Sequence, residues 1–148
     1  MKMTKDDWNE AKKFGFSKSE KWGDPFQMEK ELIDNLIVFR KKLREQFPTT
    51  KLIIHCGYEK RNTGGYHPKG MAVDLHGTSI SLADLYLMAE RYGEFGGIGV
   101  YFNWNRKGLH LDIGEKGRRW SCYKAGQYGP INKGTLYSLY LDDCFYRL

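Results

Sequence analysis

Three residues in the middle of the sequence have side chains of the types that bind catalytic zinc: His67, Asp74 and His110. Two imidazoles and one carboxylate make a three-ligand set, which leaves a fourth position on the metal for water. A metal held in this way activates water for hydrolysis. The residue types therefore point to metal-assisted hydrolysis.

The spacing of these residues predicts that they share one surface. Asp74 and His76 are two residues apart, as are His110 and Asp112, and residues i and i+2 of a strand face the same side. Neighbouring strands would thus bring four polar groups together. Asp74 lies among apolar residues, where a carboxylate is costly unless it is paired or metal-bound. A single strand histidine usually has a structural or surface role, so the spacing alone leaves that alternative open.

The elements that must position these residues follow from the apolar pattern. Residues 28–46 are predicted to form a helix, because apolar residues recur every three or four positions and Pro48 follows. A second helix is predicted from the N-cap Ser81 to Gly93, and a third over 136–145. Short strands are predicted over 52–55, 71–76, 98–101, 109–113 and 120–123. Helices around several short strands indicate the α+β class.

Length and composition fit one domain, residues 1–148, with a substantial core. The chain has 148 residues, of which 41% are hydrophobic and 15% aromatic. Its formal net charge of +6 favours an anionic partner such as nucleic acid, anionic lipid or a wall polymer, or it serves solubility. The sequence has no apolar run of roughly 18 residues, the length that a membrane span needs. We therefore expect no membrane span.

The sequence also bears on localisation and redox state. The first residues lack the apolar stretch of a secretory signal, so we expect synthesis in the cytoplasm without a signal peptide. Cys56, Cys122 and Cys144 are odd in number and have no CxxC spacing. They are expected to be ordinary reduced cysteines rather than a disulfide framework or a zinc ribbon.

Several blocks of the sequence resemble one known family. The run 67–74 (HPKGMAVD) followed by 110–112 (HLD) resembles the HxxGxAxD and HxD motifs of zinc-dependent D-Ala-D-Ala carboxypeptidases, the VanY-like peptidases with the Hedgehog/DD-peptidase fold. Further similar blocks lie in the family's order at 19–25, 54–58, 96–101 and 118–120. The resemblance covers most of the chain and is closest to the small phage and bacterial members.

The resemblance implies a fold, a metal and a substrate. The fold would be a small antiparallel sheet flanked by helices, and the ligands of Zn2+ would be His67, Asp74 and His110. The substrates would be peptidoglycan stem peptides, cleaved by a carboxypeptidase or an endopeptidase, including phage or prophage lysins. Such a protein acts on the cell wall if it is released from the cytoplasm. We expect a monomer.

The general base departs from the family pattern. Many members have an acidic residue three positions before the last histidine, where this chain has Lys107. A charged lysine cannot accept a proton, so the base is Asp112, Glu59 or another residue. Asp112 is expected to share a strand face with His110, and it could equally orient that histidine as a supporting carboxylate.

Substrate binding also departs from the pattern. Where the family often has an arginine after Gly-Tyr, this chain has Glu59, followed by Lys60 and Arg61. The guanidinium of Arg61 suits a substrate carboxylate, although it could equally be a solvated loop charge. Tyr101 is the other residue expected to bind substrate.

Two other classes of function stay open. The first is a catalytically silent relative, in which a metal stabilises a wall-binding or phage structural domain; Lys107 at the usual base position favours it. The second is a basic nucleic-acid-binding domain that stacks bases on its Tyr and Trp side chains. The sequence has no recognisable nucleic-acid motif, so no specific nucleic-acid partner is expected.

Overall fold

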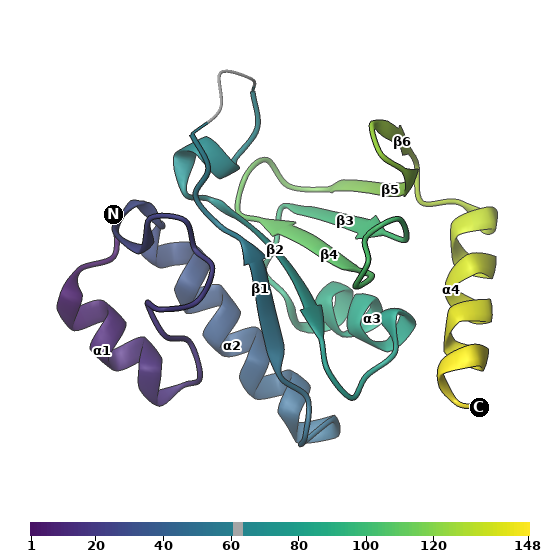
Figure 1. Ribbon diagram of the computed structural model, residues 1–148, viewed down its shortest axis with the longest axis horizontal. Coiled ribbons are helices and arrows are strands. Elements are labelled where there is room, and N and C mark those ends of the chain that lie inside the picture. Colours follow the sequence, from purple (N-terminus) through teal and green to yellow (C-terminus); the bar gives the residue numbers. More distant parts are fainter. Residues whose placement is uncertain (61–63) are drawn as a thin grey trace.

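The computed structural model describes residues 1–60 and 64–148, and in these ranges four helices accompany a six-stranded sheet (Figure 1). The helices are α1 (Lys5–Lys13), α2 (Lys30–Gln46), α3 (Leu82–Tyr92) and α4 (Lys133–Tyr146). The strands are β1 (Leu52–Cys56), β2 (Ala72–Gly77), β3 (Gly97–Tyr101), β4 (Gly108–Asp112), β5 (Arg118–Lys124) and β6 (Gln127–Gly129). Two short 3-10 turns are η1 (Pro25–Gln27) and η2 (His67–Lys69). The α+β class is confirmed.

The sheet has the strand order β1-β2-β4-β3-β5-β6 and is mixed. Neighbouring strands are antiparallel except β3 and β5, which are parallel. The expected antiparallel sheet is therefore wrong at this one pair. The short connection after β4 starts β5 beside the first residue of β3, with Gly97 opposite both Asp112 and Arg118. A strand that starts beside the beginning of β3 and pairs along it must run in the same direction.

Alternation along the central strands divides the sheet into a core face and a second face. Leu75 on β2, Leu109 on β4 and Val100 on β3 are fully buried in the hydrophobic cluster, which also holds the apolar side of α2. Helix α3 packs against β2, α2 and α4. In Figure 1, α1 and α2 lie on the β1 side of the molecule and α4 on the opposite side. The residues between the core positions on each strand lie on the second face.

The helix boundaries follow local signals. Ser81 caps α3 by accepting a hydrogen bond from the Asp84 N–H at 3.1 Å, as predicted from the sequence. The sequence analysis missed α1, although Thr4 and Asp7 form a capping box at its start. It also missed β6. In the ranges that the structure describes, no helix combines the length and the apolar character that crossing a bilayer requires.

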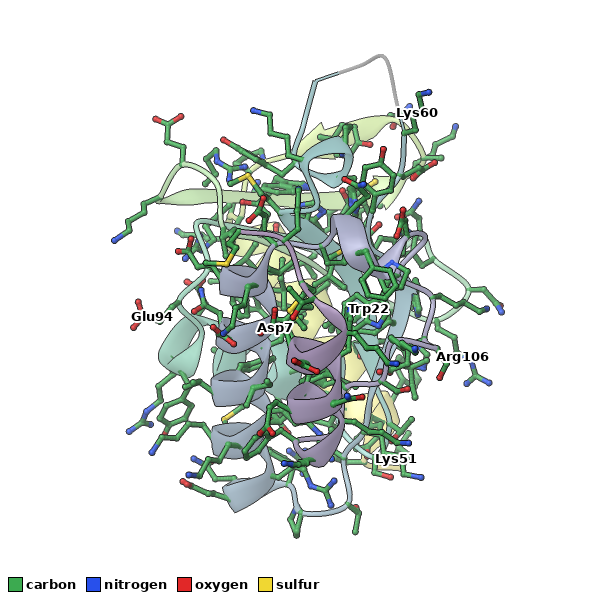
Figure 2. All side chains as sticks on the ribbon, turned by 90° about the vertical axis from the view of Figure 1, so that its left-hand side faces the viewer. Asp7, Trp22, Lys51, Lys60, Glu94 and Arg106 are labelled. Carbon is green, nitrogen blue, oxygen red and sulfur yellow. The ribbon has the colours of Figure 1, made fainter. Side chains whose placement is uncertain are left out.

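An amino-terminal segment braces the loop after β1. The Tyr58 N–H donates to the carbonyl oxygen of Trp22 at 2.7 Å. The Trp22 ring is fully buried against Trp8 and Phe16. Figure 2 labels Trp22 on the face toward the viewer and Lys60 near the top of the molecule. Gly23 has a φ of +78°, and a Cβ there would overlap the carbonyl of Tyr58. The segment 19–25, one of the blocks similar to the peptidase family, therefore fixes the end of β1.

Candidate metal centre

Asp74 and His110 lie directly opposite each other on the second face of the sheet. They are paired residues of the neighbouring strands β2 and β4. Paired residues point to the same side of a sheet. The His110 Nδ1 atom is 3.0 Å from Asp74 Oδ1. The expectation that these two strands are neighbours with Asp74 and His110 together is confirmed, but His76, the fourth polar group expected there, contacts His55 instead.

His67 reaches the same carboxylate from η2. Its Nδ1–H donates to the carbonyl oxygen of Gly57 at 2.6 Å, which directs Nε2 toward Asp74 Oδ1 at 3.2 Å. Gly70 ends η2 in the left-handed region, with a φ of +68°, and a Cβ there would overlap the carbonyl oxygen of Gln27. The glycine of the HxxGxAxD run thus permits the turn that presents His67.

Two of the distances between the expected donor atoms suit a tetrahedral zinc ion. Zinc bonds of about 2.0–2.1 Å place neighbouring ligand atoms roughly 3.3 Å apart in a tetrahedron. The distances from Asp74 Oδ1 to His67 Nε2 and His110 Nδ1, 3.2 Å and 3.0 Å, are close to that value. The two imidazole rings are 5.1 Å apart and nearly perpendicular, at 73°. The donor types, and the distances from Asp74 Oδ1, suit a small divalent cation.

Cys56 is a donor that the sequence analysis did not identify. One ligand atom from each of Cys56, His67 and Asp74 lies within 4.8 Å of the others, so in the described part of the chain these three residues, a group that does not include His110, could hold a metal ion. Cys56 ends β1 opposite Asp74. Only the register between β1 and β2 identifies Cys56 as a neighbour of Asp74. The spacing of the cysteines in the sequence does not reveal this.

Asp112 orients His110 through a hydrogen bond. Its side chain is 0% exposed, and it accepts hydrogen bonds from His110 Nε2 at 2.8 Å and from the Gly114 N–H at 2.9 Å. The Arg118 guanidinium contacts both of its oxygens. Burial opposes the charged carboxylate, but these three partners outweigh it and hold the pKa of Asp112 below its usual range. The Asp112 hydrogen bond fixes the ring so that Nδ1 faces Asp74.

The cluster holds protons when no metal is bound. Burial disfavours the charged form of His67, but its hydrogen bonds with Asp74 and Cys56 prevail and raise its pKa to about 9. His110 likewise has a raised pKa, because Asp112 and Asp74 outweigh its burial. Asp74 is buried too, yet its hydrogen bonds with His110 and His67 hold its pKa below the usual range. A metal must therefore displace protons from both histidines.

The remaining predicted site residues have different positions. Glu59 is exposed, its Oε2 is 3.5 Å from Cys56 Sγ, and its N–H donates to the His67 carbonyl oxygen at 3.4 Å. Arg61 lies outside the described residues. Lys107, at the family's usual base position, points to α4 and pairs with Asp142 at 2.9 Å.

Aromatic side chains wall a cleft of about 410 Å³ that also contains the candidate metal ligands His67, Asp74 and His110. Tyr101 stacks on Trp104 with ring centroids 4.2 Å apart, and its hydroxyl accepts a hydrogen bond from Trp120 Nε1 at 3.1 Å. Burial raises the pKa of Tyr101 to about 12, so its phenol stays neutral and can donate a hydrogen bond. The lining residues include Tyr66, His67, Asp74, Tyr101, Trp104, His110, Asp112, Arg118, Trp120 and Tyr128.

Two glycines of β3 make room for side chains from the neighbouring strands. A Cβ at Gly97 would overlap the Asp112 carboxylate, and one at Gly99 would lie 2.5 Å from the Trp120 ring. The Trp120 ring in turn lies 5.0 Å from the His110 ring. The alternating glycines of the run 96–99 (GGIG) therefore allow Asp112 and Trp120 to lean over β3 toward the centre.

We expect Gly99→Ala to displace Trp120 and lower the free energy of unfolding by about 1–3 kcal/mol, the usual cost of overpacking. Denaturant unfolding followed by tryptophan fluorescence measures both effects. Gly129→Ala is the matched control, since a Cβ there meets only Ser121 Oγ at 3.7 Å. Equal stability of the two variants would show that Trp120 does not need this space.

No protein-family model matches the chain, and a comparison with curated proteins finds no match. The functional argument therefore depends on the residues of the cleft and their geometry.

Proposed function

We propose that this protein is a zinc-dependent peptidase that hydrolyses peptide bonds in peptidoglycan stem peptides, with a Hedgehog/DD-peptidase-like fold. The observation that carries the proposal is the position of Asp74 Oδ1 between His67 Nε2 and His110 Nδ1, at 3.2 Å and 3.0 Å. These donors line an open cleft, so substrate can reach a metal held there. The motif resemblance supplies the substrate class, and the net charge of +6 suits an anionic wall.

Zinc in this position would polarise the scissile carbonyl and lower the pKa of bound water toward neutrality. His67, Asp74 and His110 would hold it, and Asp112 keeps the His110 ring in the ligating orientation. The neutral Tyr101 hydroxyl lines the cleft and can donate to the substrate's carbonyl oxygen.

Glu59 is our proposal for the proton acceptor. Its carboxylate lies beside Cys56 and is exposed, so it can exchange protons with water. Asp112 was the other candidate, but its buried oxygens already accept from His110, Gly114 and Arg118. The proposed role of Arg61 in holding a substrate carboxylate stays a prediction.

We expect Asp112→Asn to weaken zinc binding by about 10–100-fold, the usual effect of removing a partner that orients a metal ligand. Competition with a chromophoric chelator measures the affinity, and peptide hydrolysis at saturating zinc measures kcat. If Asp112 were instead the general base, kcat would fall while zinc affinity stayed unchanged. A loss of zinc affinity therefore indicates that Asp112 orients a metal ligand, whereas a loss of kcat alone indicates that it is the general base.

The decisive experiment is mass spectrometry of products from purified peptidoglycan, with and without chelator. New peptide termini that disappear when the metal is removed support the proposal, and the masses identify the bond. We expect cleavage only in the metal-loaded protein. Wall binding without any released peptide would contradict it.

A second candidate function is a catalytically silent domain that binds the wall and is stabilised by its metal. The observation in its favour is Cys56, because a fourth protein donor closes a zinc site and closed sites are structural. Sedimentation of the protein with intact peptidoglycan, without product formation, would support this alternative.

A further inference from the structure

Cys56 sits at the metal centre without a strong partner of its own. Its sulfur lies 3.9 Å from His67 Nδ1, 3.7 Å from the Gly57 carbonyl oxygen and 3.5 Å from Glu59 Oε2. These are long, weak contacts, and thiols are weak hydrogen-bond donors. The side chain is only partly buried. The Cys56 thiol can therefore rotate with little loss of hydrogen-bond energy.

The backbone places Cys56 beside the metal ligands. Cys56 is the register partner of Asp74, and an irregularity in the β1–β2 ladder lies between Ile54 and Cys56. Such an irregularity changes the direction in which a side chain points. The sulfur shares a region 4.8 Å across with donor atoms of His67 and Asp74. Tetrahedral zinc with one sulfur and one nitrogen ligand separates those atoms by roughly 3.6 Å. The sulfur contacts His67 at Nδ1, so closure requires the Cys56 side chain to swing toward Nε2, the nitrogen that faces Asp74.

We propose that Cys56 is a fourth protein donor to the metal, and that it closes the resting centre until it swings away. The proposal rests on the metal centre proposed above. On closure the thiol loses its proton to solvent, a sulfur–metal bond forms, and water leaves the fourth position. On opening the reverse exchange takes place, and the site regains the water that hydrolysis requires.

The closed form has two chemical consequences. A thiolate is a soft ligand, so Cys56 shifts the preference of the site toward zinc and away from magnesium or manganese. A sulfur bound to metal is also a poor nucleophile toward alkylating reagents. The partly exposed thiol should thus react readily in the metal-free protein and slowly in the zinc-loaded protein.

Cobalt substitution tests the bond directly. A Co2+–thiolate bond gives a charge-transfer absorption in the near ultraviolet that nitrogen and oxygen ligands do not give. We expect this band in the cobalt-loaded wild type and in Cys144→Ser, and its loss in Cys56→Ser. Cys144 is the matched control, since it is exposed and lies on α4. Cobalt binding without the band in the wild type would overturn the proposal.

Alkylation by iodoacetamide gives a second test that needs no variant. Peptide mapping of the wild type measures the rate at which Cys56 is modified with and without zinc, and Cys144 reports on general reactivity. We expect zinc to slow modification of Cys56 at least about tenfold and to leave Cys144 unchanged. Equal rates at Cys56 with and without zinc would contradict closure.

Activity separates this proposal from the proposed function. Minor states commonly have populations of up to about a tenth, so removing the thiol should raise peptide hydrolysis about tenfold in Cys56→Ala. A cobalt–thiolate band in a protein that never cleaves peptidoglycan overturns the peptidase proposal alone. Hydrolysis by a wild type that lacks the band overturns the Cys56 proposal alone. A protein that binds neither zinc nor cobalt overturns both.

Discussion

Asp74→Ala is expected to abolish metal binding and to lower peptidoglycan hydrolysis by more than about a hundredfold. Removal of a residue that only orients a ligand costs about 10–100-fold, and Asp74 is proposed to touch the metal itself. Its Oδ1 is the atom shared by His67 and His110, so its loss leaves the two imidazoles without a common partner. Zinc content after dialysis and peptide release from purified walls measure the two effects.

Asp142→Ala is the matched control for this prediction. Asp142 pairs with Lys107, which is 48% exposed, and such pairs contribute roughly 0–1 kcal/mol to stability. Neither residue lines the cleft. We expect zinc content and activity at the wild-type level in this variant. Activity retained by Asp74→Ala would remove the basis of the proposed function.

Zinc is expected to raise the midpoint of thermal unfolding by roughly 10 °C when its free concentration is about a thousand times its dissociation constant. Selective binding to the folded state at that ratio is worth about 4 kcal/mol. For a chain of this size, each kcal/mol moves the midpoint by about 2–4 °C. Differential scanning calorimetry with zinc or with chelator measures the shift, and Asp74→Ala should lose it.

The rise in the unfolding midpoint that zinc produces should grow as pH rises from about 6.5 to 8.5. The pKa of His67 is raised to about 9 in the folded metal-free protein. Its stabilising contribution is thus complete below its unfolded pKa, about 6.5, and is lost as pH rises toward 9. The metal-free form therefore weakens over this range, while zinc meets less competition from protons. An effect of zinc that is independent of pH would show that His67 is not a ligand.

The parts of the fold that sequence predicts well are those with strong periodicity. Leu32, Leu36, Phe39 and Leu43 are all fully buried on α2, which begins two residues after the predicted start. Strands β1 to β5 are found within a few residues because their apolar residues are bounded by turn residues, whereas β6 is missed. Helix α1 was missed because its apolar positions are few, and only its capping box marks it.

The candidate site likewise has a part that the sequence predicts and a part that it does not. The i and i+2 spacing was enough to place Asp74 and His110 on strands, and their pairing across β2 and β4 confirms that they share a face. Cys56 could not be found, because its position opposite Asp74 depends on the register between β1 and β2. The burial of Asp112 could not be predicted either, because it depends on Arg118, which the parallel strand β5 places beside it.

The pairing of β2 with β4 also fixes when the centre can assemble. Asp74 and His110 are 36 residues apart, and His67 comes from a turn outside the sheet. The pairing of β2 with β4 brings the Asp74 and His110 side chains together without help from an ion. We therefore expect the sheet to form first and a metal to enter a pocket that already exists. In this respect the chain differs from a zinc finger, whose folding begins with its metal.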